Sequence, residues 1–170
     1  KTRAITHRIA YAAAIGTMDP QKVLALTFTA KAAGEMRARL RTLGVPTVAA
    51  RTIHSAALKQ LLYFWPSVFG GRTPDLMTTK TGFLTEAINR AGLSSSLRAT
   101  NRELMRDIAS EIEWAKVSQV TPVDYIDQVG RRSQKPRVLP EQMVQIYTAY
   151  ESIKKQELAI DFEDVLLLCA

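Results

Sequence analysis

The sequence predicts an α/β fold: a parallel sheet with helices in the first part of the chain, followed by an all-helical part. Two short runs rich in apolar residues, 23–29 and 47–52, alternate with helical patterns in residues 1–65. Strand, helix, strand and helix at this spacing form a βαβ unit. Residues 75–170 show helical periodicity and no convincing strand. We therefore expect two different domains or a sheet domain interrupted by a helical insertion.

The elements of the first part have recognisable starts and ends. The first helix has a row of small and aliphatic residues and stops at a glycine: Ile5, Ile9, Ala12, Ala13, Gly16. Residues 23–29 are nearly all apolar, which is typical of a strand buried on both faces. A second helix opens at Thr29 or Ala30, and its apolar row ends before a glycine and a proline: Ala33, Met36, Leu40, Leu43, Gly44, Pro46. A third helix has an inward row broken at a proline: Ala57, Leu58, Leu61, Leu62, Trp65, Pro66.

Beyond a boundary loop at residues 69–74, helical rows follow one another. Two rows predict helices, the first ended by Gly92 and the second capped by Asn101 or Thr100: Phe83, Leu84, Ala87, Ile88, and Leu104, Ile108, Ile112, Ala115. Thr121 and Pro122 begin a short helix toward Val129. A basic loop spans 130–140, and a long helix follows with Met143, Ile146, Tyr147, Tyr150 and Ile153. Asp161 to Asp164 opens the last helix.

Composition and charge narrow the class of protein. The chain has 170 residues, 46% of them apolar, and a net charge of +7, which excludes a disordered tail. Residues 1–74 hold 11 Lys and Arg against two acids, whereas residues 75–170 hold 12 against 14. The basic excess of the first part favours a polyanionic partner such as nucleic acid or nucleotide. Excess arginine without any partner is the plainer alternative.

The remaining compositional signals concern location. No apolar run approaches the ~18 residues of a membrane-spanning helix, so no membrane partner is expected. A single cysteine, Cys169, forms no internal disulfide or metal cluster, which favours a cytoplasmic setting. No secretory signal is visible, and the first residue is not Met. We expect the chain to begin inside a larger protein.

Three short segments hold residues suited to chemistry. Lys1 and Thr2 at the mouth of a helix match the last two letters of a phosphate-binding loop, although the dipeptide alone has little specificity. At the end of the first strand, Phe28 is suited to stack a base and Thr29 to hold a phosphate. The plainer interpretation places Phe28 in the core and Thr29 as a helix cap. A polar turn, 51–55, follows the second strand, where Thr52 or Ser55 is also suited to cap a helix.

Together these blocks closely resemble the UvrD/Rep/PcrA family of superfamily 1 DNA helicases. The resemblance rests on Lys1-Thr2-Arg3, on the segment 24–37 with its Thr27-Phe28-Thr29-Ala30-Lys31 core, and on Thr52-Ile53-His54-Ser55, in the family's order and spacing. Residues 161–166 resemble a further family segment. The resemblance implies a partial RecA-like P-loop NTPase sheet with an all-helical inserted subdomain: domain 1A in residues 1–74, domain 1B in 75–158, and a return into 1A in 159–170.

The resemblance also implies roles for individual residues. Lys1 contacts the β- and γ-phosphates of ATP, Thr2 ligates Mg²⁺, and Arg3 lies beside the base. Single-stranded DNA is contacted by two groups: Thr27, Phe28, Thr29 and Lys31, and Thr52, His54 and Ser55. Ile53 stands where the family usually has Phe, and Ala30 where Asn is frequent, which puts a stacking role and one hydrogen bond in doubt. Asp161 and Asp164 are expected to cap and pack rather than to bind metal.

The implied function is that of a fragment of an ATP-dependent 3′-to-5′ DNA helicase, acting on single-stranded DNA and single-strand/duplex junctions with repair or replication proteins as partners. The isolated 170-residue piece is expected to lack DNA-stimulated ATPase activity. Three alternatives stay open. One is a helicase subunit of a recombination nuclease, and another is a P-loop kinase of small molecules. The third is a non-enzymatic basic module that grips nucleic acid through Arg37, Arg39, Arg41, Arg51 and the loop 131–137.

Overall fold

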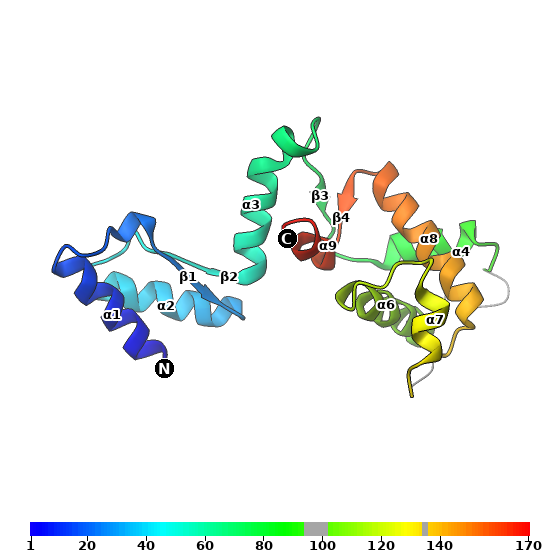
Figure 1. Cartoon of the computed structure of the whole chain (residues 1–170), viewed down its shortest axis with the longest axis horizontal. Coiled ribbons are helices and arrows are strands. Elements are labelled where there is room, and N and C mark those ends of the chain that lie inside the picture. The colour runs from blue at the N-terminus through cyan, green and yellow to red at the C-terminus, as the bar shows by residue number, and fades with distance from the viewer. Residues whose placement is uncertain (94–101, 134–135) are drawn as a thin grey trace. The chain divides into compact units, whose positions relative to one another are not determined.

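The computed structural model describes residues 1–93, 102–133 and 136–170 (Figure 1). These residues form two compact units, which are described separately. The first comprises residues 1–64 and Cys169 and is called the sheet unit; the second comprises residues 65–168 and Ala170 and is called the helical unit. Both contain a small parallel sheet, so the expected mixed α/β architecture is confirmed at that level. The expected domain boundaries at residues 74/75 and 158/159 stay predictions.

In the sheet unit, each predicted helix and strand is present. The elements are α1 (Thr2–Ala14), a short 3-10 helix η1 (Pro20–Lys22), β1 (Leu24–Thr27), α2 (Ala30–Thr42), β2 (Ala49–Thr52) and the first turns of α3 (Ile53–Val68). Strand β1 pairs with β2 in parallel, from Leu24 opposite Ala49 to Thr27 opposite Thr52. Helices α1 and α2 end at Gly16 and Gly44, whose φ angles of +72° and +80° favour glycine.

The core of the sheet unit lies on one face of its sheet. Residues from both helices and both strands form it: Ile9, Ala25, Met36, Leu40, Val45, Val48, Ala50. On the opposite face, Leu24 and Leu26 are 52% and 50% exposed. The prediction of a strand buried on both faces is therefore wrong for β1, because α1 and α2 both pack on the face of Ala25 and Ala50.

Two further expectations about helices needed correction. Ile5 is 49% exposed, and the adjacent Thr6 is fully buried instead. The hydroxyl of Thr6 donates to the carbonyl oxygens of Thr2 and Arg3 at 3.2 and 3.0 Å. Because these bonds satisfy the hydroxyl within the helix, Thr6 can be buried without an unpaired polar group. Pro66 lies inside α3 rather than ending it, since the helix runs on to Val68.

The helical unit contains the predicted helices around one large core. Its elements after α3 are β3 (Asp75–Leu76), α4 (Thr81–Arg90), α6 (Arg102–Val117), α7 (Tyr125–Gly130), α8 (Pro140–Gln156), β4 (Ala159–Ile160) and α9 (Phe162–Leu167). Fully buried members of the core include Ile88, Ile108, Ile112, Ile146 and Tyr150. Within the described residues, no helix is long and apolar enough to cross a membrane.

The helical unit also differs from expectation in detail. Strands β3 and β4 pair in parallel, although no strand was expected after residue 75; two residues are too short to show a period in sequence. Helix α7 begins at Tyr125, and Thr121 instead caps the preceding turn by accepting a bond from the amide of Asp124 at 3.4 Å. The expected cap at Thr100 or Asn101 lies outside the described residues.

Candidate functional site

The carboxyl ends of β1 and β2 bring two of the three predicted segments together. Thr27 and Thr52 are register partners at the last position of the two parallel strands. Each strand leads at once into a helix, α2 from Ala30 and α3 from Ile53. Helix amino ends and polar side chains therefore gather at one edge, where open α/β sheets bind their ligands. This edge is called the carboxyl edge below.

The threonines of the carboxyl edge hold its backbone in shape. Thr27 donates from its hydroxyl to the carbonyl oxygens of Thr29 at 3.1 Å and Arg51 at 3.4 Å, which links the turn after β1 to β2. Thr29 caps α2 by accepting from the amide of Ala32 at 3.1 Å. Thr52 accepts from the amide of Ser55 at 3.1 Å. The predicted capping roles of Thr29 and Thr52 are thus confirmed, and Ser55 supplies the capped amide.

Phe28 is the most exposed large apolar side chain of the carboxyl edge. It lies on the turn between β1 and α2 and is 90% exposed, so the interpretation that placed its ring in the core is wrong. Lys31 and Ser55 are also exposed, and His54 is half-buried in the first turn of α3. An exposed aromatic ring beside an ammonium group and hydroxyls is the combination that stacks and neutralises single-stranded nucleic acid.

The third predicted segment forms the amino end of α1. Figure 1 shows that α1 runs opposite to β1, so the end bearing Lys1 lies on the same side of the sheet unit as the carboxyl edge. Lys1 and Arg3 are exposed and Thr2 is half-buried. Lys1 is the N-cap residue and makes no side-chain capping bond, so the first amides of α1 have no side-chain acceptor from it. Such an end attracts anions.

Part of the predicted basic surface is engaged inside the fold. Arg37 donates to the carbonyl oxygen of Ala50 at 3.2 Å. In the helical unit, Arg132 donates to Glu111 at 2.5 Å and its guanidinium lies 3.7 Å from the centre of the Trp114 ring. Arg137 lies 3.2 Å from a carboxylate oxygen of Asp107. Arg132 is largely covered, whereas Arg37 is exposed and Arg137 is 69% exposed, so the last two guanidinium groups stay accessible to an external polyanion.

A buried ionic cluster in the helical unit was missed by sequence reasoning. Its members come from α6, α8 and the start of α9: Lys116, Glu151, Lys154, Asp161, Asp164. The sequence does contain a pattern that indicates this cluster. Lys116 follows the buried Ile112 by four positions, and Lys154 follows the buried Tyr150 by four, so both lysines lie on the apolar row of their helix. A lysine on the apolar row of a helix needs a buried partner.

Asp161 and Asp164 confirm the expectation that they cap α9. Their side chains accept from each other's amides at 2.9 and 3.0 Å, which forms a capping box. Carboxylate oxygens of Glu151, Asp161 and Asp164 lie within 4.8 Å of one another. The ammonium groups of Lys116 and Lys154 already supply the positive charge that a cation would bring to these carboxylates.

The cluster shifts the ionisation of its members. Burial alone would raise the pKa of Asp161, but attraction by Lys154 and Lys116 outweighs it and holds that pKa well below its usual range. Burial alone would lower the pKa of Lys116. The neighbouring carboxylates, Asp161 first among them, overcome burial and raise this pKa above its usual value.

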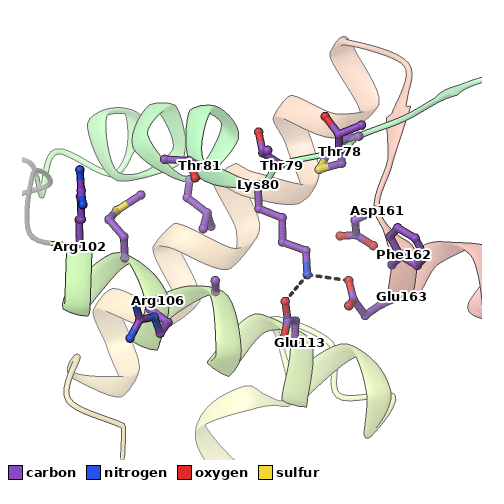
Figure 2. A pocket seen from close by; sticks show the side chains of 14 residues that line it. Thr78, Thr79, Lys80, Thr81, Arg102, Arg106, Glu113, Asp161, Phe162 and Glu163 are labelled. Atoms are coloured by element: carbon purple, nitrogen blue, oxygen red, sulfur yellow. Dashed lines mark hydrogen bonds and ion pairs between the residues drawn. The ribbon is translucent and has the colours of Figure 1, made fainter. Parts of the chain in front are cut away.

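A cavity of about 900 Å³ lies in the helical unit between the start of α4, the first turns of α6 and the start of α9 (Figure 2). Lys80 extends across it and donates to Glu113 at 2.8 Å and Glu163 at 2.7 Å. Burial opposes the charge on Lys80, but these two hydrogen bonds raise its pKa above the usual value. The lining of the cavity combines the charges of these side chains with threonine hydroxyls and with the apolar side chains of Met77 and Leu84.

Comparison with known proteins places the chain in a family. It is 40% identical to the ATP-dependent DNA helicase UvrD2 of Mycobacterium tuberculosis over 98% of its own length and 25% of that protein. It is 30% identical to the ATP-dependent DNA helicase PcrA of Leuconostoc citreum over 99% of its length and 22% of the relative. The chain thus spans about a quarter of the length of these relatives. The model of the UvrD/REP helicase N-terminal domain matches residues 1–170, and the chain belongs to this helicase family.

Proposed function

We propose that the intact protein is an ATP-dependent 3′-to-5′ DNA helicase, in which this chain forms part of the RecA-like motor domain 1A and the inserted helical domain 1B. The proposed assignment is residues 1–74 and 159–170 to 1A and 75–158 to 1B. The observation that carries the proposal is the carboxyl edge, where Thr27 and Thr52 lie side by side and Phe28 is exposed. Membership of the helicase family supports it.

The amino end of α1 is the proposed nucleotide site. Lys1 would contact the β- and γ-phosphates of ATP, Thr2 would ligate Mg²⁺, and Arg3 would lie beside the base. The end suits phosphates because α1 is 13 residues long, has exposed cations at its start and lacks a side-chain cap. ATP hydrolysis would supply the free energy for movement along DNA, and these three side chains would bind and orient the nucleotide.

The carboxyl edge is the proposed path of single-stranded DNA. The exposed ring of Phe28 would stack on a base, and the exposed Lys31 would neutralise a phosphate. The other proposed contacts are Thr27, Thr29, Thr52, His54 and Ser55. Thr29 and Thr52 keep a free lone pair on hydroxyls that already accept one amide bond, so capping is compatible with contacting DNA.

The biological setting belongs to the same proposal. Single-strand/duplex junctions would be the substrates, and repair or replication proteins in the cytoplasm would be the partners. The family relationship supports a DNA helicase over a basic module without enzymatic activity.

The proposal is tested by Lys1→Ala in the intact protein. We expect DNA-stimulated ATP hydrolysis to fall by about 10²-fold or more, because a cation on the transferred phosphate stabilises the transition state. Lys22→Ala is the matched control, since Lys22 is exposed and makes only a surface ion pair with Asp19 at 4.0 Å. Direction is tested separately, by comparing the unwinding of duplexes with 3′ and 5′ single-stranded tails. Full ATPase activity in Lys1→Ala would contradict the proposal.

A further inference from the structure

Helix α9 (Phe162–Leu167) begins with three carboxylates, those of its cap Asp161 and of Glu163 and Asp164 in its first turn. Among its apolar side chains only Val165 is buried, at 1% exposure, whereas Phe162, Leu166 and Leu167 are 38–52% exposed. The preceding strand β4 adds two residues paired with β3. Ile160 of β4 and Val165 of α9 are buried, at 5% and 1% exposure, so apolar packing contributes to docking at these two positions.

Three lysines from three different segments converge on the first turn of α9. Lys80, just before α4, donates to Glu163 at 2.7 Å (Figure 2). Lys116 of α6 donates to both carboxylate oxygens of Asp161 at 2.7 Å and also to Asp164. Lys154 of α8 donates to Asp164 at 2.5 Å and to Asp161 at 3.2 Å. These three lysines and the carboxylates that they hold, Asp161, Glu163 and Asp164, are together called the lysine clamp below.

The inner part of the lysine clamp is shielded from water. The side chains of Lys116 and Lys154 are 3% exposed and that of Asp161 is fully buried. Tyr150 of α8 adds a hydrogen bond to Asp161 at 3.0 Å. Charges buried in this way are stable only while their partners stay in place, so the interaction is directional and specific to one arrangement of α9.

We propose that the lysine clamp, acting together with the buried Ile160 and Val165, docks the segment 159–167 onto the helical unit, and that this segment docks and releases as one piece. The consequence is mechanical: while the lysine clamp is closed, α9 moves with α4, α6 and α8. The inference rests on the contacts within the helical unit and does not depend on the proposed helicase function.

The test is amide hydrogen exchange of the full chain, followed by mass spectrometry. The main variant neutralises the inner charges but keeps side-chain size and capping groups: Lys116→Met, Glu151→Gln, Lys154→Met, Asp161→Asn and Asp164→Asn. We expect exchange in residues 161–168 to become at least tenfold faster, while the centres of α6 and α8 change by less than threefold. Lys155→Met is the matched control, an exposed lysine on the same helix that should leave both regions unchanged.

Two results would overturn the proposal. Unchanged protection of residues 161–168 in the neutral variant would mean that side-chain shape and apolar contacts suffice for docking. Equal acceleration in α6, α8 and α9 would mean that the charges support the helical unit in general and do not act on α9 in particular.

Discussion

The carboxyl edge and the lysine clamp use similar side chains in opposite ways. At the carboxyl edge, Phe28 and Lys31 are exposed and the threonines bond to nearby backbone. In the lysine clamp, Lys116 and Asp161 are buried and satisfy each other. The side chains of the carboxyl edge are therefore open to contact an external partner. The charged groups of the lysine clamp are instead paired with one another inside the fold.

This difference predicts which measurement each side chain affects. A group that is satisfied inside the fold contributes to the free energy of unfolding, and its loss leaves a buried partner without compensation. A group open to solvent contributes little to stability and is available for binding. Substitutions in the two regions should therefore separate cleanly into effects on stability and effects on DNA affinity.

The largest expected effect is that of Asp161→Ala. Two buried ammonium groups would lose their shared carboxylate and α9 would lose its cap, so the helical unit should lose about 3–5 kcal/mol of unfolding free energy. Urea unfolding followed by tryptophan fluorescence measures this directly, because both tryptophans, Trp65 and Trp114, belong to the helical unit.

The control for this substitution is Asp75→Ala in the same unit. Asp75 pairs with Arg72 at 2.7 Å, but both side chains are 74% exposed. An ion pair so accessible to water contributes about 0–1 kcal/mol. If Asp161→Ala and Asp75→Ala shifted the unfolding midpoint equally, burial of the lysine clamp would have no energetic consequence.

Phe28→Ala should have the reverse profile. We expect single-stranded DNA affinity of the intact protein to weaken by about 1–3 kcal/mol through loss of base stacking. Stability should change by no more than about 0.5 kcal/mol, because the ring is already in solvent. Anisotropy of a labelled oligonucleotide measures the affinity, and circular dichroism measures the stability.

Tyr11→Ala is the matched control for Phe28→Ala. Tyr11 is 67% exposed and also lies in the sheet unit, but near the carboxyl end of α1, the end opposite Lys1. Its loss should leave DNA affinity unchanged. Equal weakening by both substitutions would show that exposed rings bind DNA without regard to position. That result would contradict the proposal that the carboxyl edge is the path of single-stranded DNA.

Acid should act on the lysine clamp before the carboxyl edge. The pKa of Asp161 is lower in the folded than in the unfolded protein, so its stabilising contribution is complete above the unfolded pKa near 4 and declines below it. The groups facing Asp161 are Lys116 from α6, Tyr150, Glu151 and Lys154 from α8, and Asp164 from α9. Between about pH 4 and pH 2.5 the helical unit should lose up to about 2 kcal/mol.

The measurement is urea unfolding at a series of pH values, again by tryptophan fluorescence. Asp161→Asn should flatten the decline below pH 4, because the variant has no carboxyl group to protonate at this position. An identical pH profile in the variant would assign the acid sensitivity to another carboxylate.

How far the sequence predicts these two regions depends on the range of the interactions. Helices and strands of the sheet unit are local patterns, and the turns at Thr29 and Gly44 mark their limits, so they were predictable. The exposure of Phe28 was not, because an aromatic residue next to an apolar strand is equally compatible with the core. The lysine clamp joins residues up to 83 positions apart, such as Lys80 and Glu163, and no local pattern encodes that pairing. The β3–β4 pair was also missed, because its two-residue strands are too short to show a period and pair residues far apart in the sequence.

The smallest expected effect concerns how the two units end their helices. The sheet unit ends α1 and α2 with Gly16 and Gly44 in the left-handed conformation, and the helical unit ends α4 with Gly92 in the same way, but it ends α6 with Gln119 at φ +56°. Gln119 makes the same two backbone bonds as Gly44, its amide to Lys116 at 3.0 Å and the next amide to Ala115 at 2.7 Å.

Gln119→Gly should therefore stabilise the helical unit by about 1 kcal/mol, because glycine adopts this conformation without a Cβ clash. The side chain of Gln119 is exposed, so little packing is lost with it. The reciprocal substitution, Gly44→Ala, should destabilise the sheet unit by a similar amount through strain alone, since no atom lies within 4 Å of the added Cβ. Urea unfolding of both variants checks the pair, with stabilisation required for Gln119→Gly and destabilisation for Gly44→Ala. Reversed signs in the two variants would mean that the altered freedom of the unfolded chain outweighs the strain relieved or imposed in the fold.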